Sequence, residues 1–153
     1  LHVSTVELPA LVEDCLYTYN ELFRHEDLAV TYVSPEEDLP EIPGDPERLS
    51  QVFLNILDNA CKYGKNGKKS DVNITHDDAT VSVCIRDYGP GIPPAELPQV
   101  KKKFFKGSSK ERGSGIGLAV CDEIVTRHNG TLDIANAAGG GVRVTVTLPR
   151  KAS

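Results

Sequence analysis

The chain has 153 residues, of which 39% are hydrophobic and 25% are charged, and its formal net charge is −5 at pH 7. This length and composition predict one domain, spanning 1–153, with a core large enough to fold without disulfide or metal support. The negative charge argues against a general nucleic-acid or anionic-membrane surface, so any phosphate binding is expected to be local.

The cysteines and the apolar runs indicate the cellular compartment of the protein. Cys15, Cys61, Cys84 and Cys121 form no Cys-x-x-Cys pair and no zinc-ligand spacing, so we expect reduced, mostly buried thiols of a cytoplasmic protein. No run approaches the roughly 18–20 apolar residues of a membrane span, and no signal peptide is visible. Because the chain lacks Met and starts at Leu1, we expect an excised piece of a longer protein, whose own membrane anchoring stays open.

Period-2 alternation of apolar and polar residues predicts six strands. They span residues 2–8, 28–34, 71–78, 79–87, 131–137 and 141–149. Two pairs form antiparallel hairpins, and helices separate the others, so the strands cannot all be parallel. The fold class expected is an α/β sandwich, with three helices on one face of a mixed, mainly antiparallel sheet of about five or six strands.

Helical spacing and capping residues predict three helices. The first covers 9–23. The second has Asp45 as its N-cap and Pro46 in its first position, and it runs to about Tyr63. The third follows the Gly-rich segment GSGIGLAV and stops at the Asn129-Gly130 pair. The segment PEEDLPEIPGDPERLSQ, which leads into the second helix, is turn-rich, and the long irregular stretch from Tyr88 to Arg112 is typical of a functional or disordered loop.

The second helix carries polar groups on the face opposite its apolar stripe. At about 100° per residue, Asn55, Asn59 and Lys62 fall within roughly 60° of one another. Amide oxygens suit Mg²⁺, which keeps several waters and is shared with substrate phosphates, and a lysine can pair with phosphate. An exposed polar helix face is the alternative. The opposite stripe consists of Leu49, Val52, Phe53, Ile56, Leu57 and Ala60.

Two glycine-rich segments suggest a nucleotide site. DYGPGI follows a strand that ends at Asp87, where a fixed carboxylate can accept a hydrogen bond from an exocyclic amine such as that of adenine. GSGIGLAV places glycines at the start of a helix, where free backbone N–H groups favour phosphate. A turn with a solvated Asp and a flexible linker are the alternatives. The Gly-x-Gly-x-Gly spacing and the surroundings fit neither a dinucleotide-binding motif nor a Walker loop.

In this order, the motifs resemble the nucleotide-binding domain of sensor histidine kinases, in the wider family that includes Hsp90 chaperones, type II topoisomerase ATPase subunits and MutL. GDPERLSQVFLNILDNACKYG is similar to the N box, DYGPGI to the first glycine box, KKKFFKG to the F box and GSGIGLAV to the second glycine box. The resemblance runs from about Ser4 to Pro149. It implies the left-handed Bergerat-type α/β sandwich, with an ATP lid over about 92–112.

The resemblance implies roles for individual residues. Asn59 would ligate Mg²⁺ with the assistance of Asn55, Asp87 would bind the adenine amine, and Lys106 would reach the γ-phosphate. Thr145 would lie beside Asp87, near the base through a water. The remaining nucleotide-binding residues implied are Lys62, Tyr63, Gly89, Gly91, Ile92, Gly113, Ser114, Gly115, Gly117 and Leu118.

Asn55 separates two kinds of chemistry within this family. ATP-hydrolysing relatives have a glutamate there as general base, whereas a neutral amide suits a domain that positions ATP for attack by a histidine supplied elsewhere. The expected function is therefore a histidine kinase catalytic domain that uses ATP and Mg²⁺. A conformational clamp driven by ATP and a degenerate nucleotide-binding module are the alternatives.

No phosphoacceptor segment is recognisable. HEDLAV at His25 lies inside the nucleotide-binding region and lacks the residues expected after such a histidine, and His2, His76 and His128 are interpreted as surface residues or helix-terminus cations. The acceptor would therefore lie on a dimerisation domain of the parent kinase, which would in turn serve a response regulator. We expect no nucleic-acid partner and a monomeric isolated domain that binds ATP without phosphorylating itself.

Overall fold

The computed structural model describes residues 1–23, 29–33, 35, 38–64, 69–100 and 117–151, and within these it describes the backbone but not the side chains of 22–23 and 61–64. The elements in chain order are β1 (Ser4–Val6), α1 (Leu8–Phe23), β2 (Ala29–Tyr32), β3 (Ile42–Gly44), α2 (Pro46–Gly64), β4 (Lys69–His76), β5 (Thr80–Asp87), the short 3₁₀ helix η2 (Leu97–Gln99), α3 (Gly117–Arg127), β6 (Thr131–Asn136) and β7 (Val142–Pro149).

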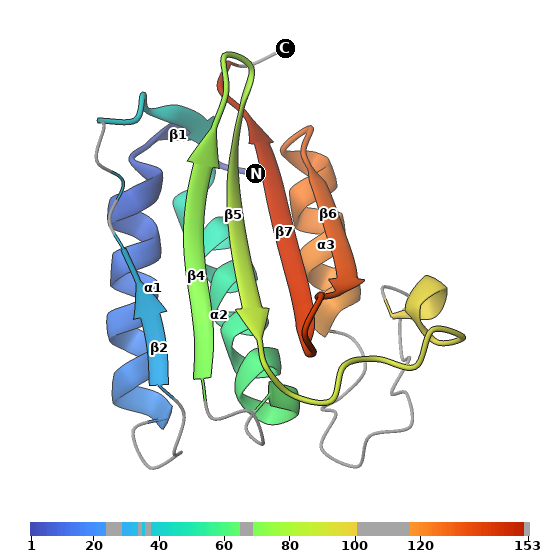
Figure 1. Cartoon of the computed structure of the whole chain (residues 1–153). Coiled ribbons are helices and arrows are strands. Elements are labelled where there is room, and N and C mark those ends of the chain that lie inside the picture. Colours follow the sequence, from blue (N-terminus) through green and yellow to red (C-terminus); the bar gives the residue numbers. More distant parts are fainter. Residues whose placement is uncertain (24–28, 34, 36–37, 65–68, 101–116, 152–153) are drawn as a thin grey trace.

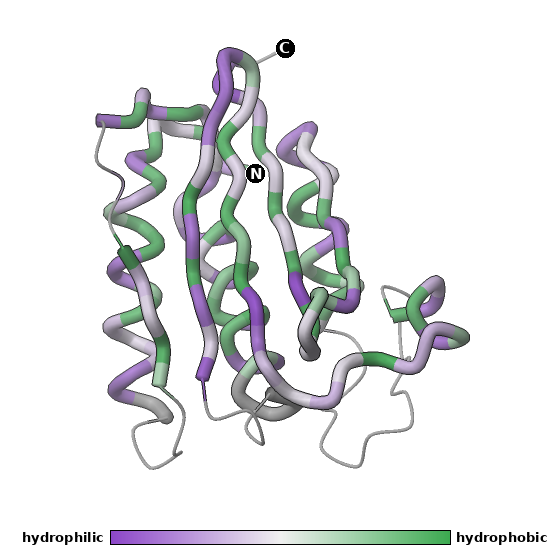
Figure 2. Tube along the Cα trace, viewed as in Figure 1, coloured by the Kyte–Doolittle hydropathy of each residue, from purple (hydrophilic) through white to green (hydrophobic). Residues whose placement is uncertain are grey.

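The described residues form two layers. Five strands make a mixed sheet in the order β2-β4-β5-β7-β6, in which β2 is parallel to β4 and the other neighbours are antiparallel. Helices α1, α2 and α3 all lie behind this sheet in Figure 1, so one sheet face is open. The expected α/β sandwich is confirmed. Hydropathy alternates along the strands because only one face packs against helices (Figure 2).

The strand β3 was not predicted from the sequence. Its three residues lie in the segment expected to be only turn, and they pair antiparallel with β1 in a separate two-stranded sheet. Two prolines and a glycine around so short a strand hide the alternation on which prediction depends. The structure therefore has seven strands among the described residues, in place of the six expected.

Helix α2 packs as its apolar pattern predicts. Asp45 caps the helix, because its Oδ1 accepts a hydrogen bond from the Arg48 amide at 3.2 Å and its carbonyl accepts one from Leu49 at 2.9 Å. Each residue of the apolar stripe is buried, and none is more than 6% exposed: Leu49, Val52, Phe53, Ile56, Leu57 and Ala60. The apolar stripe therefore packs into the core.

His128 is not the surface cation that its position after α3 suggested. It is 7% exposed, its Nδ1–H donates to the Ile124 carbonyl at 2.8 Å, and its Nε2 accepts from the Asp45 amide at 3.0 Å. Because an amide can only donate, this ring is neutral. The contact ties the end of α3 to the start of α2. The adjacent Asn129 has φ 62° and ends the helix, as the Asn-Gly pair predicted.

Two further expectations can be compared with the described residues. Cys15 and Cys121 are buried and Cys84 is half-buried, and all three are free thiols, as predicted; Cys61 has no described side chain. Within the described part of the chain, none of the helices has the length and apolar character required to cross a membrane.

Candidate nucleotide-binding site

Asp87 is a buried carboxylate at the end of β5. It is 5% exposed, and its Oδ1 accepts hydrogen bonds from the amides of Gly89 at 3.0 Å and Val142 at 3.1 Å. Burial raises the pKa of this carboxyl above its ordinary value, although the two amides and the nearby charge of Arg86 act in the opposite direction. Among the described residues, the hydrogen-bond partners of the carboxylate all bind Oδ1, so Oδ2 retains its capacity to accept a hydrogen bond from a ligand.

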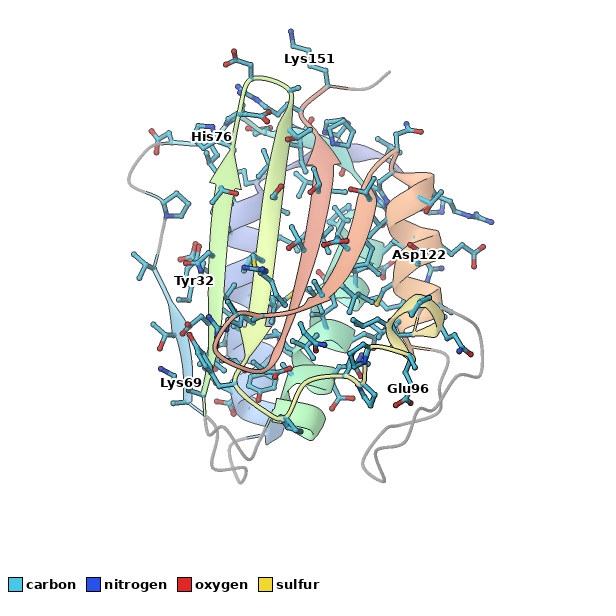
Figure 3. The ribbon with its side chains drawn as sticks, turned by 45° about the vertical axis from the view of Figure 1, so that its right-hand side comes forward. Tyr32, Lys69, His76, Glu96, Asp122 and Lys151 are labelled. Atoms are coloured by element: carbon cyan, nitrogen blue, oxygen red, sulfur yellow. The ribbon has the colours of Figure 1, made fainter. Side chains whose placement is uncertain are left out.

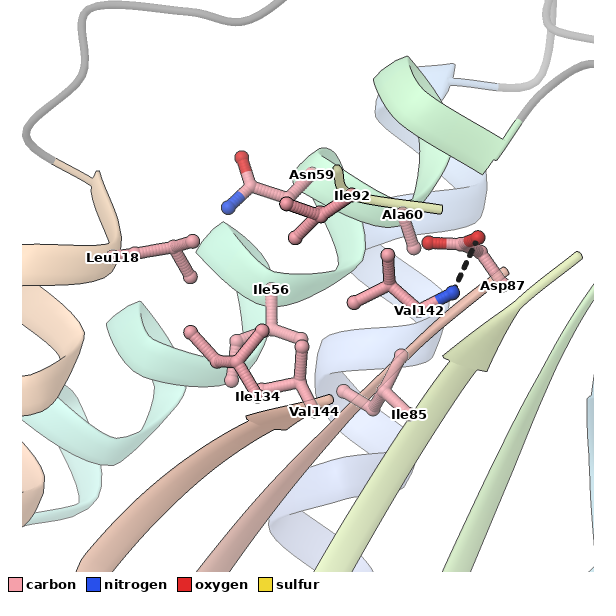
Figure 4. Close-up of a pocket in the computed structure, with 10 residues that line it drawn as sticks. All are labelled: Ile56, Asn59, Ala60, Ile85, Asp87, Ile92, Leu118, Ile134, Val142 and Val144. Carbon is pink, nitrogen blue, oxygen red and sulfur yellow. Dashed lines mark hydrogen bonds between the residues drawn. The ribbon is translucent and has the colours of Figure 1, made fainter. Parts of the chain in front are cut away.

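The carboxylate lines an apolar pocket between the sheet and the helices (Figure 4). Its cavity volume is about 20 Å³, which is room for about one water and far less than a purine needs. A base therefore needs more room than the described residues leave in this pocket. The pocket is lined by Ile56, Asn59 and Ala60 of α2, Ile85 and Asp87 of β5, Ile92, Leu118 of α3, Ile134 of β6, and Val142 and Val144 of β7.

The loop after Asp87 is held by a residue that the sequence did not single out. Asn136, at the end of β6, accepts a hydrogen bond from the Ile92 amide and donates one to the Ile92 carbonyl, each at 2.8 Å. Gly91 precedes this contact with φ 84°, and a Cβ there would lie 2.9 Å from the Asn136 side-chain oxygen. Asn136 thus fixes Ile92 in the pocket wall. A polar residue at a strand end gives no sequence signal for so distant a contact.

The two asparagines of α2 have different surroundings. Asn59 lines the pocket, whereas the Asn55 side chain lies beside the Cys121 thiol of α3 and acts to lower the pKa of that thiol. Burial raises the pKa of Cys121 to about 11, so it is a neutral thiol, which donates to the Val52 carbonyl at 3.7 Å. One amide is therefore directed to the pocket, and the other is held against the neighbouring helix.

These features match a known family. The family model described as histidine kinase-, DNA gyrase B- and HSP90-like ATPase matches residues 44–152. The chain belongs to this family. It is 35% identical over 145 residues to the adaptive-response sensory kinase SasA of Rippkaea orientalis, covering 93% of this chain and 37% of the relative. It is 34% identical over 150 residues to the histidine-protein kinase BaeS of Escherichia coli, covering 95% and 32%.

A solved structure supports the same assignment. The mycobacterial sensor histidine kinase MprB has a TM-score of 0.78 and 29% identity, with 98% of this chain and 99% of that chain covered. The chain is thus a histidine kinase-type ATP-binding domain, as the four motifs indicated. It spans about a third of the length of the curated relatives that it matches.

The resemblance implied that Thr145 lies beside Asp87, and this expectation is wrong. The register of β5 and β7 places Thr145 opposite Cys84, on the sheet face away from the helices, and the β7 residue that meets Asp87 is Val142. Alternation along a strand puts residues an odd number of positions apart on opposite faces, so Thr145 cannot share the Asp87 side of the sheet. It does not line the pocket.

Other predicted site residues fall partly outside the described structure. Gly117 is the first residue of α3, and Leu118 lines the pocket. Lys62 and Tyr63 lie in α2, but their side chains are outside the description. The predicted lid begins in described residues, with Ile92 and Val100 buried. Lys106, Gly113, Ser114 and Gly115 lie outside the described residues.

A polar cluster on the open sheet face contacts the start of the loop that follows Asp87. Lys69 Nζ and the Arg86 guanidinium each lie 4.2 Å from the centroid of the Tyr88 ring, and the Tyr88 hydroxyl donates to Asp71. Arg86 also donates to the carbonyls of Ala138 at 2.9 Å and Gly140 at 3.1 Å. Figure 3 places Lys69 at the end of β4 opposite to His76. The cluster joins the first glycine box to the β6–β7 turn.

Proposed function

We propose that this chain is the catalytic domain of a two-component sensor histidine kinase, which binds ATP with Mg²⁺ and transfers the γ-phosphoryl group to a histidine on a separate dimerisation domain of its parent. The phosphoryl group would then pass to a response regulator. The observation that carries the proposal is Asp87, a buried carboxylate whose Oδ2 is left for a ligand in an apolar pocket that also contains the Asn59 amide.

The pocket suits a flat base with one exocyclic donor. A carboxylate accepts hydrogen bonds and repels phosphate, so the end of the pocket at Asp87 favours the amine of adenine and not the phosphate chain. The apolar lining would cover the faces of the ring. Asn59 comes from the helix layer and Asp87 from the sheet (Figure 4).

The amides of α2 suit a magnesium ion shared with phosphates. No group of three or more His, Cys, Asp or Glu residues in the described part of the chain could hold a metal by itself, which fits an ion bound partly by ligand oxygens and water. Asn59 would hold Mg²⁺, and Asn55 would assist from one turn earlier. The ion would neutralise developing charge on the phosphates. Neither amide can act as a general base, which favours transfer to a histidine over hydrolysis.

Calorimetric titration with ADP, with and without Mg²⁺, tests the site. We expect binding that Mg²⁺ strengthens in the unmodified chain, and loss of that strengthening in Asn59→Ala, because the variant lacks the proposed metal ligand. Asn73→Ala is the matched control, since Asn73 is exposed on β4. If the folded, unmodified chain does not bind ADP, a degenerate module is the better interpretation.

The same proposal covers the parent kinase, the cellular location of this domain and the source of the acceptor histidine. We infer a cytoplasmic domain whose parent kinase supplies the acceptor histidine. Incubation with γ-labelled ATP should therefore leave the isolated chain unlabelled and should label a parent that contains the dimerisation domain. Label on the isolated chain would contradict this division of roles.

A further inference from the structure

Ser70 is a fully buried hydroxyl with no partner among the described residues. It is the second residue of β4, its exposed fraction is 0%, and its Oγ is without a hydrogen bond. Burial of an unsatisfied hydroxyl costs stability, because the hydroxyl gives up its hydrogen bonds to water without a replacement. Such a group in a folded protein requires an explanation, and alanine at this position would avoid the cost.

The position of Ser70 relates it to the base pocket. In the β4–β5 register Ser70 lies directly opposite Asp87, on neighbouring strands at the same end of the sheet (Figure 1). Directly opposed residues share a face, with Cβ atoms roughly 4.5–5.5 Å apart. Both residues are buried on the helix-facing side, and the next β4 residue on that side, Val72, is apolar. Ser70 itself is not among the residues that line the pocket, so its hydroxyl meets a ligand only when the side chains around Asp87 move to admit the base.

The two groups have complementary hydrogen-bonding capacity. An ionised Asp87 only accepts, whereas a serine hydroxyl can donate as well. The edge of adenine presents an amine donor beside a ring-nitrogen acceptor. A carboxylate alone satisfies the amine and leaves the ring nitrogen without a protein donor. The described residues show Oδ2 of Asp87 and Oγ of Ser70 both available at this end of the sheet.

We propose that Ser70 is a second base-recognition residue, whose hydroxyl donates, directly or through one water, to the ring nitrogen beside the amine held by Asp87. This inference rests on the proposed function. It explains why a buried hydroxyl is retained at a cost to the ligand-free fold: its partner is present only in the nucleotide complex.

The variant Ser70→Ala separates this role from a structural one. Because the hydroxyl has no partner in the ligand-free protein, its removal should raise the melting temperature by roughly 2–4 °C. The same change should weaken ADP binding roughly three- to tenfold, since one hydrogen bond of the complex is lost. Ser70→Cys keeps a similar volume with a weaker donor and should also weaken binding.

Ser82→Ala is the matched control. Ser82 lies on β5 on the open face, and its hydroxyl is bonded to that of Thr147 at 3.0 Å. Its removal should lower the melting temperature and leave ADP affinity unchanged. Unchanged ADP affinity in Ser70→Ala, or weaker affinity with a lower melting temperature, would overturn the role of Ser70 while leaving the nucleotide site intact. Absence of ADP binding by the unmodified chain would instead refute the proposed function itself.

Discussion

At the scale of single residues, the site buries polar groups at a cost to the ligand-free fold. Burial raises the pKa of Asp87, which means that its ionised form is disfavoured in the folded protein. A carboxyl whose folded pKa exceeds its unfolded pKa binds more protons when folded, so stability falls as pH rises through that interval. At neutral pH the charge of Asp87 therefore destabilises the ligand-free chain.

Asp87→Asn should accordingly raise stability and weaken nucleotide binding. The Asn carbonyl can keep the bonds from Gly89 and Val142, which leaves its NH₂ group facing the adenine amine, donor against donor. We expect about 10- to 100-fold weaker ADP binding by calorimetry and a higher melting temperature at pH 7. Asp133→Asn, on an exposed position of β6, is the control. A lower melting temperature in Asp87→Asn would contradict the proposal that the buried charge destabilises the ligand-free chain.

The pH dependence follows from the same carboxyl. ADP affinity of the unmodified chain, measured by calorimetry, should decline as pH falls through the raised pKa, hence at a pH above the ordinary Asp value of 3.8. Because Oδ1 is held by two amides, the proton is added at Oδ2, which is the oxygen that would accept from the amine.

Sequence reasoning located Asp87 and Asn59 but misplaced or missed several neighbours. Asp87 belongs to a local motif, and its own strand determines its burial. Val142, Asn136 and Ser70 reach the site through pairings between distant strands, and such register cannot be read from a single strand's alternation. The resemblance implied Thr145 as the neighbour of Asp87, but the register pairs Thr145 with Cys84.

At the scale of elements, the β6–β7 turn is shaped by its contact with the end of β5. Gly139, Gly140 and Gly141 all have positive φ, but only Gly141 approaches another segment closely: a Cβ there would lie 2.0 Å from the Asp87 carbonyl oxygen. The turn and the first glycine box therefore fit together only without a side chain at Gly141.

Gly141→Ala should disrupt this fit and Gly139→Ala should not. At Gly139, which has φ 87°, a Cβ would lie 3.5 Å from Arg86 Nη2 as its nearest neighbour, so both variants carry the backbone strain and only one carries the clash. We expect about 1–2 kcal/mol of destabilisation for Gly139→Ala and about 3–5 kcal/mol for Gly141→Ala, measured by urea unfolding. ADP binding should be lost in Gly141→Ala. Equal destabilisation by the two variants would show that the positive φ, and not the clash with Asp87, determines the loss of stability.

Most elements could be predicted because their patterns are local. The stripe of α2, its cap at Asp45 and the two hairpins have short-range signals that the fold retains. The strand β3 lacks such a signal, since its three residues become a strand only through pairing with β1. His128 likewise became a core residue because Asp45, far away in sequence, supplies its donor.

At the scale of the whole molecule, the open sheet face is polar. Exposed positions there include Lys69, Asn73, Asp133 and Arg143, and polar groups of both signs in this density do not form the apolar centre of a stable dimer. The net charge of −5 also opposes self-association.

We therefore expect the isolated chain to remain monomeric, with or without ATP and Mg²⁺, when its mass is measured by light scattering. A conformational clamp driven by ATP would instead dimerise upon nucleotide binding. A nucleotide-dependent dimer would favour that second class of function, and a mass independent of nucleotide would exclude it.

The small volume of the pocket has a kinetic consequence. A site with room for about one water binds a base only during the fraction of time in which it is open. The apparent dissociation constant then equals the intrinsic constant divided by that fraction, and the association rate falls below the usual range for a preformed site. Any event elsewhere in the parent protein that changes the opening equilibrium would thereby alter nucleotide occupancy without contact with the nucleotide.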